Sequence, residues 1–193
     1  MDAFYTRQGE GFHCGKSAYF IRLGGCDVGC HWCDTVNSWE AEAHPVIPVN
    51  EIVEMAAAQL SKLAVVTGGE PAMYNLRPLT ELLNKKVIKT HIETSGAYPL
   101  SGNWDWVCLS PKKARPPVED VLLKANELKV IIYNNADFRW AEEQAKRVGS
   151  GCLLYLQPEW SRAMKNMPTI LSYMQVYPQW GLSLQAHKYA GIP

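Results

Sequence analysis

The sequence predicts an α/β fold with a mostly parallel sheet, and three observations support this prediction. Apolar, β-branched runs alternate with helical patterns, and parallel strands need such crossover helices between them. Gly-Gly, Ser-Pro and Gln-Pro pairs follow successive apolar runs, at the strand ends where α/β sheets carry their sites. The chain has 193 residues, whereas a full eight-unit barrel needs about 250. We therefore expect one domain, residues 1–193, forming a partial, shortened TIM-like barrel.

Seven runs are expected to form strands, because they are rich in β-branched and aromatic residues and are bounded by turn residues. They cover residues 17–25, 63–70, 87–96, 106–111, 127–133, 152–158 and 180–185. Helical patterns lie between several of them, at residues 50–63, 76–86, 136–149 and, less regularly, around 162–178. Asn50 is predicted to cap the first helix, and Gly149 to end the third.

Composition narrows the classes of partner. Lysine plus arginine and aspartate plus glutamate each number 19, so no net charge draws the chain to nucleic acid or to an anionic membrane. The N-terminal segment lacks a basic, apolar leader, and no segment reaches the roughly 18 consecutive apolar residues of a membrane span. We expect a cytoplasmic protein with a small-molecule partner. In that reducing compartment its six cysteines are expected to be ligands or buried thiols.

Three cysteines, Cys26, Cys30 and Cys33, are spaced C-x3-C-x2-C in a glycine-rich loop after the first long apolar run. A structural zinc site would need a distant fourth ligand, and it usually comes as paired units, of which the chain has no second. The candidates for that fourth ligand are Cys14, His13, His31 and His44. Cys108 and Cys152 lie in apolar runs and are interpreted as core residues. The remaining option is a [4Fe–4S] cluster with one iron open to a substrate-like ligand.

The spacing C-x3-C-x-aromatic-C, with Trp32 as the aromatic residue, resembles the signature of the radical S-adenosylmethionine (SAM) superfamily. The turn "TGGEP" at residues 67–71 is by itself an ordinary strand-end turn, but after such a loop it resembles the superfamily's GGE motif. The resemblance implies a radical SAM type of barrel in which SAM binds the open iron. Its implied SAM contacts are Trp32, Gly68, Gly69, Glu70, Glu93, Ser110, Pro111, Lys112, Gln157, Pro158, Glu159 and Trp160.

Three further segments are more specific: "YTRQGEGFHCGKSAYFIRLGGC", "CDT" and "SLQAHKYAGIP". Together they resemble the 7-carboxy-7-deazaguanine synthase family, over residues 4–193. That resemblance implies a carbon–nitrogen lyase of 7-deazapurine and queuosine biosynthesis that uses SAM, a [4Fe–4S] cluster and Mg²⁺. Its implied substrate is 6-carboxy-5,6,7,8-tetrahydropterin, which loses a hydrogen from C6, undergoes ring contraction and loses ammonia.

The family resemblance also implies roles for single residues. Thr35 would ligate Mg²⁺ through its hydroxyl, although a threonine at this place is commonly a cap. Arg22 would pair with the substrate carboxylate, and the terminal carboxylate of Pro193 would close over the pterin. The implied substrate-binding residues are Arg7, Gln8, Gly9, Glu10, Arg22, Thr67, His187 and Pro193.

Two departures from the family pattern concern arginine at position 7, usually aliphatic, and "QPEW" at residues 157–160, usually Gln-Pro-Met-Asp. A flavodoxin or ferredoxin as reductant is the family expectation, and a homodimer would cover the edge of a partial barrel. Two alternatives stay open. One is a glycyl-radical-activating enzyme, which shares the cysteine spacing but acts on a protein, and the other is a non-catalytic iron–sulfur or zinc protein.

Overall fold

The computed structural model describes residues 2–193, which build one curved sheet of eight strands in the order β1 to β8. The strands are β1 (Asp2–Arg7), β2 (Ser17–Leu23), β3 (Leu63–Gly68), β4 (Lys89–Thr94), β5 (Trp106–Leu109), β6 (Glu127–Ile132), β7 (Leu153–Pro158) and β8 (Trp180–Leu182). β1 pairs with β2 in antiparallel fashion, and all other neighbours are parallel. Because β1 and β8 form the two edges, the sheet is the open, partial barrel that the sequence predicts.

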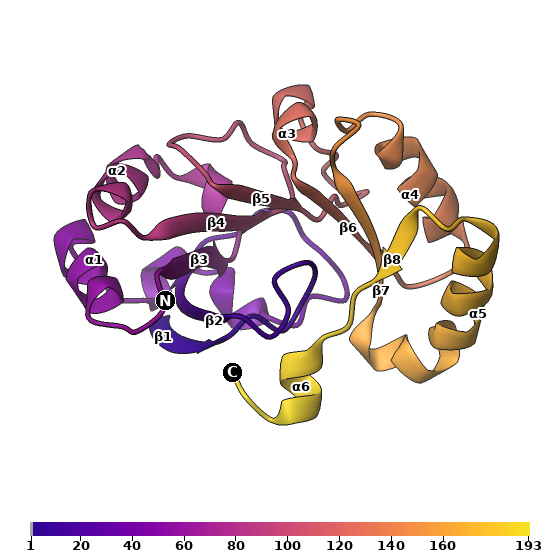
Figure 1. Cartoon of the computed structure of the whole chain (residues 1–193), viewed down its shortest axis with the longest axis horizontal. Coiled ribbons are helices and arrows are strands. Elements are labelled where there is room, and N and C mark those ends of the chain that lie inside the picture. The colour runs from indigo at the N-terminus through magenta and orange to yellow at the C-terminus, as the bar shows by residue number, and fades with distance from the viewer. Residues whose placement is uncertain (1) are drawn as a thin grey trace.

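Five helices lie along the convex side of the sheet, and α6 lies apart from them, near the gap between the two sheet edges (Figure 1). The helices are α1 (Val49–Ala57), α2 (Arg77–Lys85), α3 (Glu119–Lys124), α4 (Ala136–Ala145), α5 (Ala163–Val176) and α6 (Ala186–Ala190). Four short 3₁₀ helices complete the fold: η1 (Val36–Ser38), η2 (Ala41–Ala43), η3 (Pro71–Met73) and η4 (Trp160–Arg162). The helices of residues 2–193 are all too short or too polar to cross a membrane.

The alternation of side chains along the strands divides the molecule into two layers. Residues such as Ile92, Leu109 and Leu128 are buried in the core between the sheet and the outer helices. Their neighbours in the sequence point to the other face, and there the strands carry buried polar groups, including His91 and Lys129. An interior with charged groups is unusual for a packed core, because unpaired buried charges are costly. This inner layer is therefore where a polar site is expected.

The loop between β1 and β2, residues 8–16, crosses the inside of the barrel. The carbonyl of Gly9 accepts from Ala186 N at 2.8 Å, and Gly11 N donates to Ser183 Oγ at 3.0 Å. Phe12 N donates to Glu127 Oε2 at 3.2 Å. The loop thus joins the first strands to the C-terminal segment across the open side of the sheet.

Several local predictions differ from the structure. All seven predicted strands are present, but β1, α3 and α6 were not predicted. The helices α3 and α6 have only six and five residues, and β1 carries no clear apolar period. Asn50 is not an N-cap: α1 begins at Val49, after Pro48, and no side chain caps it. The fixed φ of proline already sets the first turn there. Helix α1 also ends at Ala57, before its predicted end, and α4 ends at Ala145, before Gly149.

Candidate active site

A cavity of about 260 Å³ opens at the carboxyl ends of the parallel strands. Of the predicted site residues, only Pro111 does not line it. The cavity brings together Arg7, Gln8, Gly9, Glu10, Arg22, Cys26, Cys30, Trp32, Cys33, Thr35, Thr67, Gly68, Gly69, Glu70, Glu93, Ser110, Lys112, Gln157, Pro158, Glu159, Trp160, His187 and Pro193. Residues from both ends of the sequence therefore meet at one place. The sequence did not point to two further lining residues, Lys129 and Gln185.

The cysteine loop follows β2 and is fixed by its backbone. Gly25 N donates to Ser38 O at 2.7 Å, and Cys26 N donates to Trp39 O at 3.2 Å. Within the loop, Cys33 N donates to Cys30 O at 3.1 Å. These bonds hold the loop against η1 and leave the three thiols at the wall of the cavity.

The three thiols fit a cluster better than a single ion. Four thiolates around one zinc ion at 2.3 Å would lie about 3.8 Å apart. Among residues 2–193, the one group of three His, Cys, Asp or Glu donors lying within 4.8 Å of one another is His91, Glu93 and Cys108. The three loop cysteines do not form such a group, so at least one pair of their sulfur atoms lies farther apart than 4.8 Å. Cys14 is exposed and does not line the cavity.

The glycines of "TGGEP" allow the turn after β3 to lie against the cysteine loop. Gly69 N donates to Leu23 O at 2.8 Å, and Glu70 N donates to Gly25 O at 2.9 Å. A Cβ on Gly69 would lie 2.1 Å from Gly25 O, and Gly68 has φ of +122° with its own Cβ position 2.2 Å from Leu23 O. Only glycine fits at both positions. The turn therefore braces the start of the cysteine loop, whatever ligand it also contacts.

The Glu70 carboxylate is buried, at 1% exposure, and is held by uncharged donors. It accepts from Ala72 N at 3.0 Å, from Thr94 Oγ1 at 2.5 Å and from Ser95 N at 2.8 Å. The Ser95 hydroxyl donates to it as well. These four bonds use the roughly four lone-pair sites of a carboxylate. A ligand ammonium at Glu70 would therefore replace or share one of these donors.

Lys112 and Trp32 form part of the wall beside the cysteines. Lys112 Nζ donates to the backbone oxygen of Ser110 at 2.5 Å and to its hydroxyl at 2.7 Å, and it lies 5.5 Å from the centre of the Trp32 ring. Burial lowers the pKa of Lys112. Burial also raises the pKa of the Cys30 thiol, and the Lys112 charge opposes that shift.

The "QPEW" segment ends β7 and has a structural explanation. The Glu159 carboxylate caps η4, accepting from Ser161 N at 3.0 Å and from Ser161 Oγ at 2.7 Å. Gln157 accepts from Ser183 Oγ at 2.6 Å. Trp160 is 40% exposed and packs edge-on against Tyr189 of α6. Glu159, one of the two residues of this segment that depart from the family pattern, thus caps η4 at the wall of the cavity.

Four side chains form what we call the charged floor: Gln8, Glu10, Glu93 and Lys129. Lys129 Nζ donates to Glu10 Oε2 at 2.6 Å and to Glu93 Oε2 at 2.9 Å, while Gln8 Nε2 donates to Glu93 Oε1 at 2.9 Å. Burial opposes the charge on Lys129, but the acidic groups around it outweigh burial and raise its pKa well above the usual value. Burial likewise opposes ionisation of Glu93, and Lys129 lowers the pKa of that carboxyl well below its usual range.

The C-terminal segment connects this floor to the cysteine loop. Gln185 Nε2 donates to Glu10 Oε1 and to Asp34 Oδ2, each at 3.0 Å. Lys188 Nζ donates to the same Asp34 oxygen at 2.5 Å. Burial alone would raise the pKa of Asp34, but the bonds from Lys188 and Gln185 outweigh it and lower that pKa.

The remaining predicted side chains differ in the contacts that they make within the protein. Arg22 and Thr67 are register partners on β2 and β3. The Thr35 hydroxyl makes no capping bond, and its one hydrogen bond is with Cys33 Sγ at 3.6 Å. His187 lies against Gly9, where an added Cβ would meet its ring at 2.2 Å. The Arg7 guanidinium donates one hydrogen bond to Gly15 O at 2.8 Å, which ties this side chain to the β1–β2 loop.

Comparison with known proteins decides the family. A 7-carboxy-7-deazaguanine synthase of Flavobacterium psychrophilum is 53% identical over 100% of this chain and 91% of its own length. The chain belongs to the 7-carboxy-7-deazaguanine synthase family. The synthase of Synechocystis is 47% identical over 99% of the chain and 91% of its own length. The crystal structure of QueE from Escherichia coli superposes with a TM-score of 0.84 at 30% identity, covering 96% of this chain and 92% of that one. No family model matches.

Membership of the synthase family confirms three predictions made from the sequence. The family, the partial-barrel α/β fold and an enzyme, a lyase of queuosine biosynthesis, stand as predicted. The family is one of radical SAM enzymes, which implies SAM and a [4Fe–4S] cluster, and its members act on a small molecule. The sulfur atoms of the three loop cysteines do not all lie within 4.8 Å of one another, which is compatible with that cofactor set.

Proposed function

We propose that this enzyme converts 6-carboxy-5,6,7,8-tetrahydropterin to 7-carboxy-7-deazaguanine, with SAM between the cysteine loop and the GGE turn and the pterin over the charged floor. The observation that carries the proposal is that one cavity is lined by three cysteines at one end and by a paired set of buried charges at the other. A cofactor and a polar substrate can therefore meet inside a single enclosure.

Cys26, Cys30 and Cys33 are proposed to hold the cluster. With SAM bound beside it, the cluster would supply the radical chemistry that removes a hydrogen atom from C6 of the pterin. The protein positions the two reactants and excludes water. Gly68, Gly69 and Glu70 form the wall closest to the cysteine loop, because their turn is bonded directly to Leu23 and Gly25. The other proposed SAM contacts are Trp32, Glu93, Ser110, Lys112, Gln157, Pro158, Glu159 and Trp160.

The substrate is proposed to bind through complementary charges. A pterin presents adjacent N–H donors on its pyrimidine edge, and Glu10 offers a carboxylate to receive them. Arg22 is proposed to take the substrate carboxylate, because guanidinium matches a carboxylate in two parallel bonds. Thr35 is proposed as a ligand of Mg²⁺, since its hydroxyl is not used as a cap and oxygen donors suit this ion.

The enclosure favours a small substrate over a protein partner. The loop of residues 8–16 crosses the barrel interior, and α6 lies over its open side. Arg22, His187 and Pro193 line the same cavity, and a glycyl-radical-activating enzyme would have no need of them. A flavodoxin or ferredoxin as reductant, a cytoplasmic location, a single domain and a homodimer remain parts of this proposal.

The test is an anaerobic incubation of the reconstituted enzyme with SAM, Mg²⁺, a low-potential reductant and the tetrahydropterin, read by mass spectrometry. Formation of 7-carboxy-7-deazaguanine supports the proposal. If 5′-deoxyadenosine appears without that product, the substrate assignment is wrong. If neither appears in protein with a full complement of iron, the non-catalytic alternative is favoured.

A further inference from the structure

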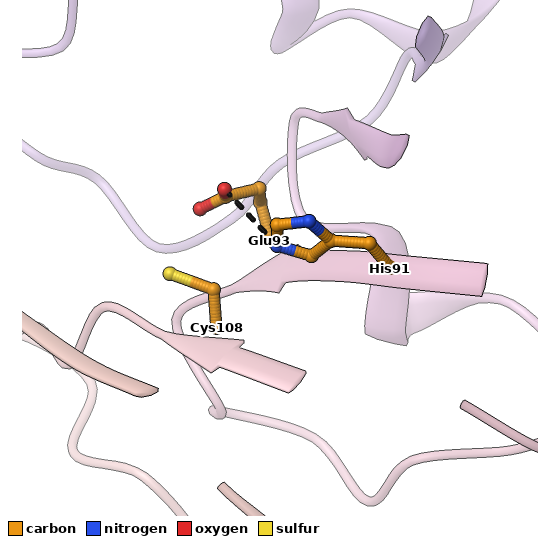
Figure 2. Close-up of side chains that lie close together, drawn as sticks. All are labelled: His91, Glu93 and Cys108. Atoms are coloured by element: carbon orange, nitrogen blue, oxygen red, sulfur yellow. Dashed lines mark ion pairs between the residues drawn. The ribbon is translucent and has the colours of Figure 1, made fainter. Parts of the chain in front are cut away.

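The deepest polar group of the barrel consists of His91, Glu93 and Cys108 (Figure 2), whose donor atoms lie within 4.8 Å of one another. Such a group could in principle hold a metal ion. Both Glu93 oxygens are already used, however, one by Lys129 and the other by Gln8. His91 Nε2 lies 3.3 Å from Glu93 Oε1 without forming a hydrogen bond. A divalent ion would lie beside the Lys129 ammonium, so we do not interpret this group as a metal site; through Glu93 it adjoins the charged floor.

Lys129 organises the floor, because it is the cation that bridges its two carboxylates. Its side chain is 4% exposed, and those of Glu10 and Glu93 are 17% and 16% exposed. Without Lys129, two partly buried carboxylates would be left near each other, and like charges in such a place disfavour ionisation. The ammonium therefore compensates the charge of both carboxylates.

The bonds to Glu10 also fix its direction. Its Oε2 accepts from Lys129 at 2.6 Å and its Oε1 from Gln185 at 3.0 Å. Each carboxylate oxygen can accept about two hydrogen bonds. Each oxygen therefore keeps one acceptor position, and this pair matches two adjacent N–H donors of a ligand.

We propose that Lys129 is a positioning residue for the pterin, holding the Glu10 carboxylate in the direction that faces the N–H edge of the substrate. This inference rests on the proposed function, since it assumes that a pterin binds over the floor. Lys129 does not itself touch the reacting carbon. Its role is to fix the direction of the Glu10 carboxylate, which binds the substrate.

The groups that surround Lys129 and Glu10 come from several elements and define the expected pH behaviour. From the sheet they are Glu93 and His91 on β4, Cys108 on β5 and Glu127 on β6, with Lys112 just after β5. From the loops and the C-terminal segment they are Glu10, Asp34, His187 and Lys188. Burial opposes ionisation of Glu93, but Lys129 lowers the pKa of that carboxyl in the intact floor. Loss of the ammonium removes this effect, so the floor is expected to become more sensitive to falling pH.

The experiment measures binding of 6-carboxypterin, an unreactive oxidised analogue, by its fluorescence between pH 6 and pH 8.5 in the reconstituted enzyme. Lys129→Met is expected to weaken binding about tenfold or more at pH 7, and increasingly as the pH falls. In turnover, KM should rise more than kcat falls. Lys129→Arg should keep most of the affinity, and the exposed Lys124→Met serves as a matched control.

A double variant, Glu93→Gln with Lys129→Met, removes one of the two uncompensated carboxylates and guards against a folding defect. It should bind the analogue better than Lys129→Met and with a weaker pH dependence. The inference is wrong if folded Lys129→Met binds 6-carboxypterin as tightly as the wild type. It is also wrong if the variant loses affinity equally at every pH and the double variant does not restore it. If the wild type forms product while Lys129→Met behaves normally, only this inference fails; if the wild type forms none, the proposed function fails with it.

Discussion

Two carboxylates in one cavity are held in opposite ways. Glu70, beside the cysteine loop, accepts only from backbone and hydroxyl donors, whereas Glu10 in the charged floor is paired with a buried ammonium. Uncharged donors leave a net negative charge available to a cation such as the ammonium of SAM. A carboxylate with its own cation is instead directed in space, for a ligand that brings neutral N–H donors.

The surroundings of Glu70 and Glu10 also differ, because one depends on close packing and the other on charge. The cysteine end depends on close approach of backbones, as at Gly69 and Gly25, and therefore on shape. The charged floor depends on the balance among Glu10, Glu93 and Lys129, and therefore on protonation. Changes of volume should damage the first region, and changes of charge should damage the second.

Removing a cysteine should have the largest effect, because it removes a proposed ligand. Cys30→Ala is expected to abolish both the iron–sulfur chromophore and turnover, measured by iron analysis and product formation. Cys14→Ala, at an exposed position outside the cavity lining, is the control and should keep both. Full iron loading in Cys30→Ala would show the ligand assignment to be wrong.

Gly69→Ala tests the shape of the cysteine end. Its Cβ would lie 2.1 Å from Gly25 O and 3.1 Å from the Cys26 Cβ, so the cysteine loop must shift. We expect the SAM-induced change in the EPR spectrum of the reduced cluster, and the rate of turnover, to fall at least about tenfold. Gly151→Ala, where an added Cβ meets nothing within 4 Å, should leave both unchanged. A wild-type response in Gly69→Ala would argue against the bracing role of the turn.

Glu70→Gln tests the hydrogen-bond ring at the cysteine end. The new amide would place donor hydrogens against Thr94, Ser95 or Ala72, whose groups already donate. An unpaired buried donor costs about 1–3 kcal/mol, so the free energy of unfolding in urea should fall by that amount. The control is Glu54→Gln, at an exposed ion pair with Lys86. Equal stabilities for the two variants would contradict the account.

The smallest expected effect concerns His13, at the outer end of the charged floor. Burial, together with the His91 and Lys16 charges, lowers its pKa from 6.5 to about 4. The folded state thus favours neutral His13, so stability is full above pH 6.5 and declines as the pH falls toward 4. Allowing for solvent screening, the decline should be roughly 1–2 kcal/mol. His13→Phe should flatten the unfolding free energy over this interval, and an unchanged slope would contradict the assignment.

The sequence predicted the parts of the site that short motifs carry. Cys26, Cys30 and Cys33 fall within one loop, and the GGE turn follows one strand, so spacing alone brings each set together. The seven parallel or edge strands were likewise readable from their apolar runs. The local pattern could not show why glycine is needed at position 69. The reason is that Gly69 lies against Gly25, which follows another strand.

Long-range pairs account for most of what was missed. Lys129 is one of two charged residues, with Glu127, in the otherwise apolar strand "ELKVII". Its place inside the barrel depends on Glu10, from a loop 119 positions away. Gln185 likewise acquires its role by meeting Glu10 and Asp34. The local signal available was charge in an otherwise apolar strand, because a lysine is almost never fully buried unless it is paired. The Asn50 cap failed for the opposite reason, since Pro48 already set the start of that helix.

The most direct test of the contrast between the two regions measures two kinds of binding in two variants of the reconstituted enzyme. SAM binding is read from the EPR spectrum of the reduced cluster, and 6-carboxypterin binding from its fluorescence at pH 7. The account predicts that Gly69→Ala loses the SAM response and keeps the pterin, whereas Lys129→Met keeps the SAM response and loses the pterin. Loss of both ligands in both variants, or the reverse pattern, would contradict it.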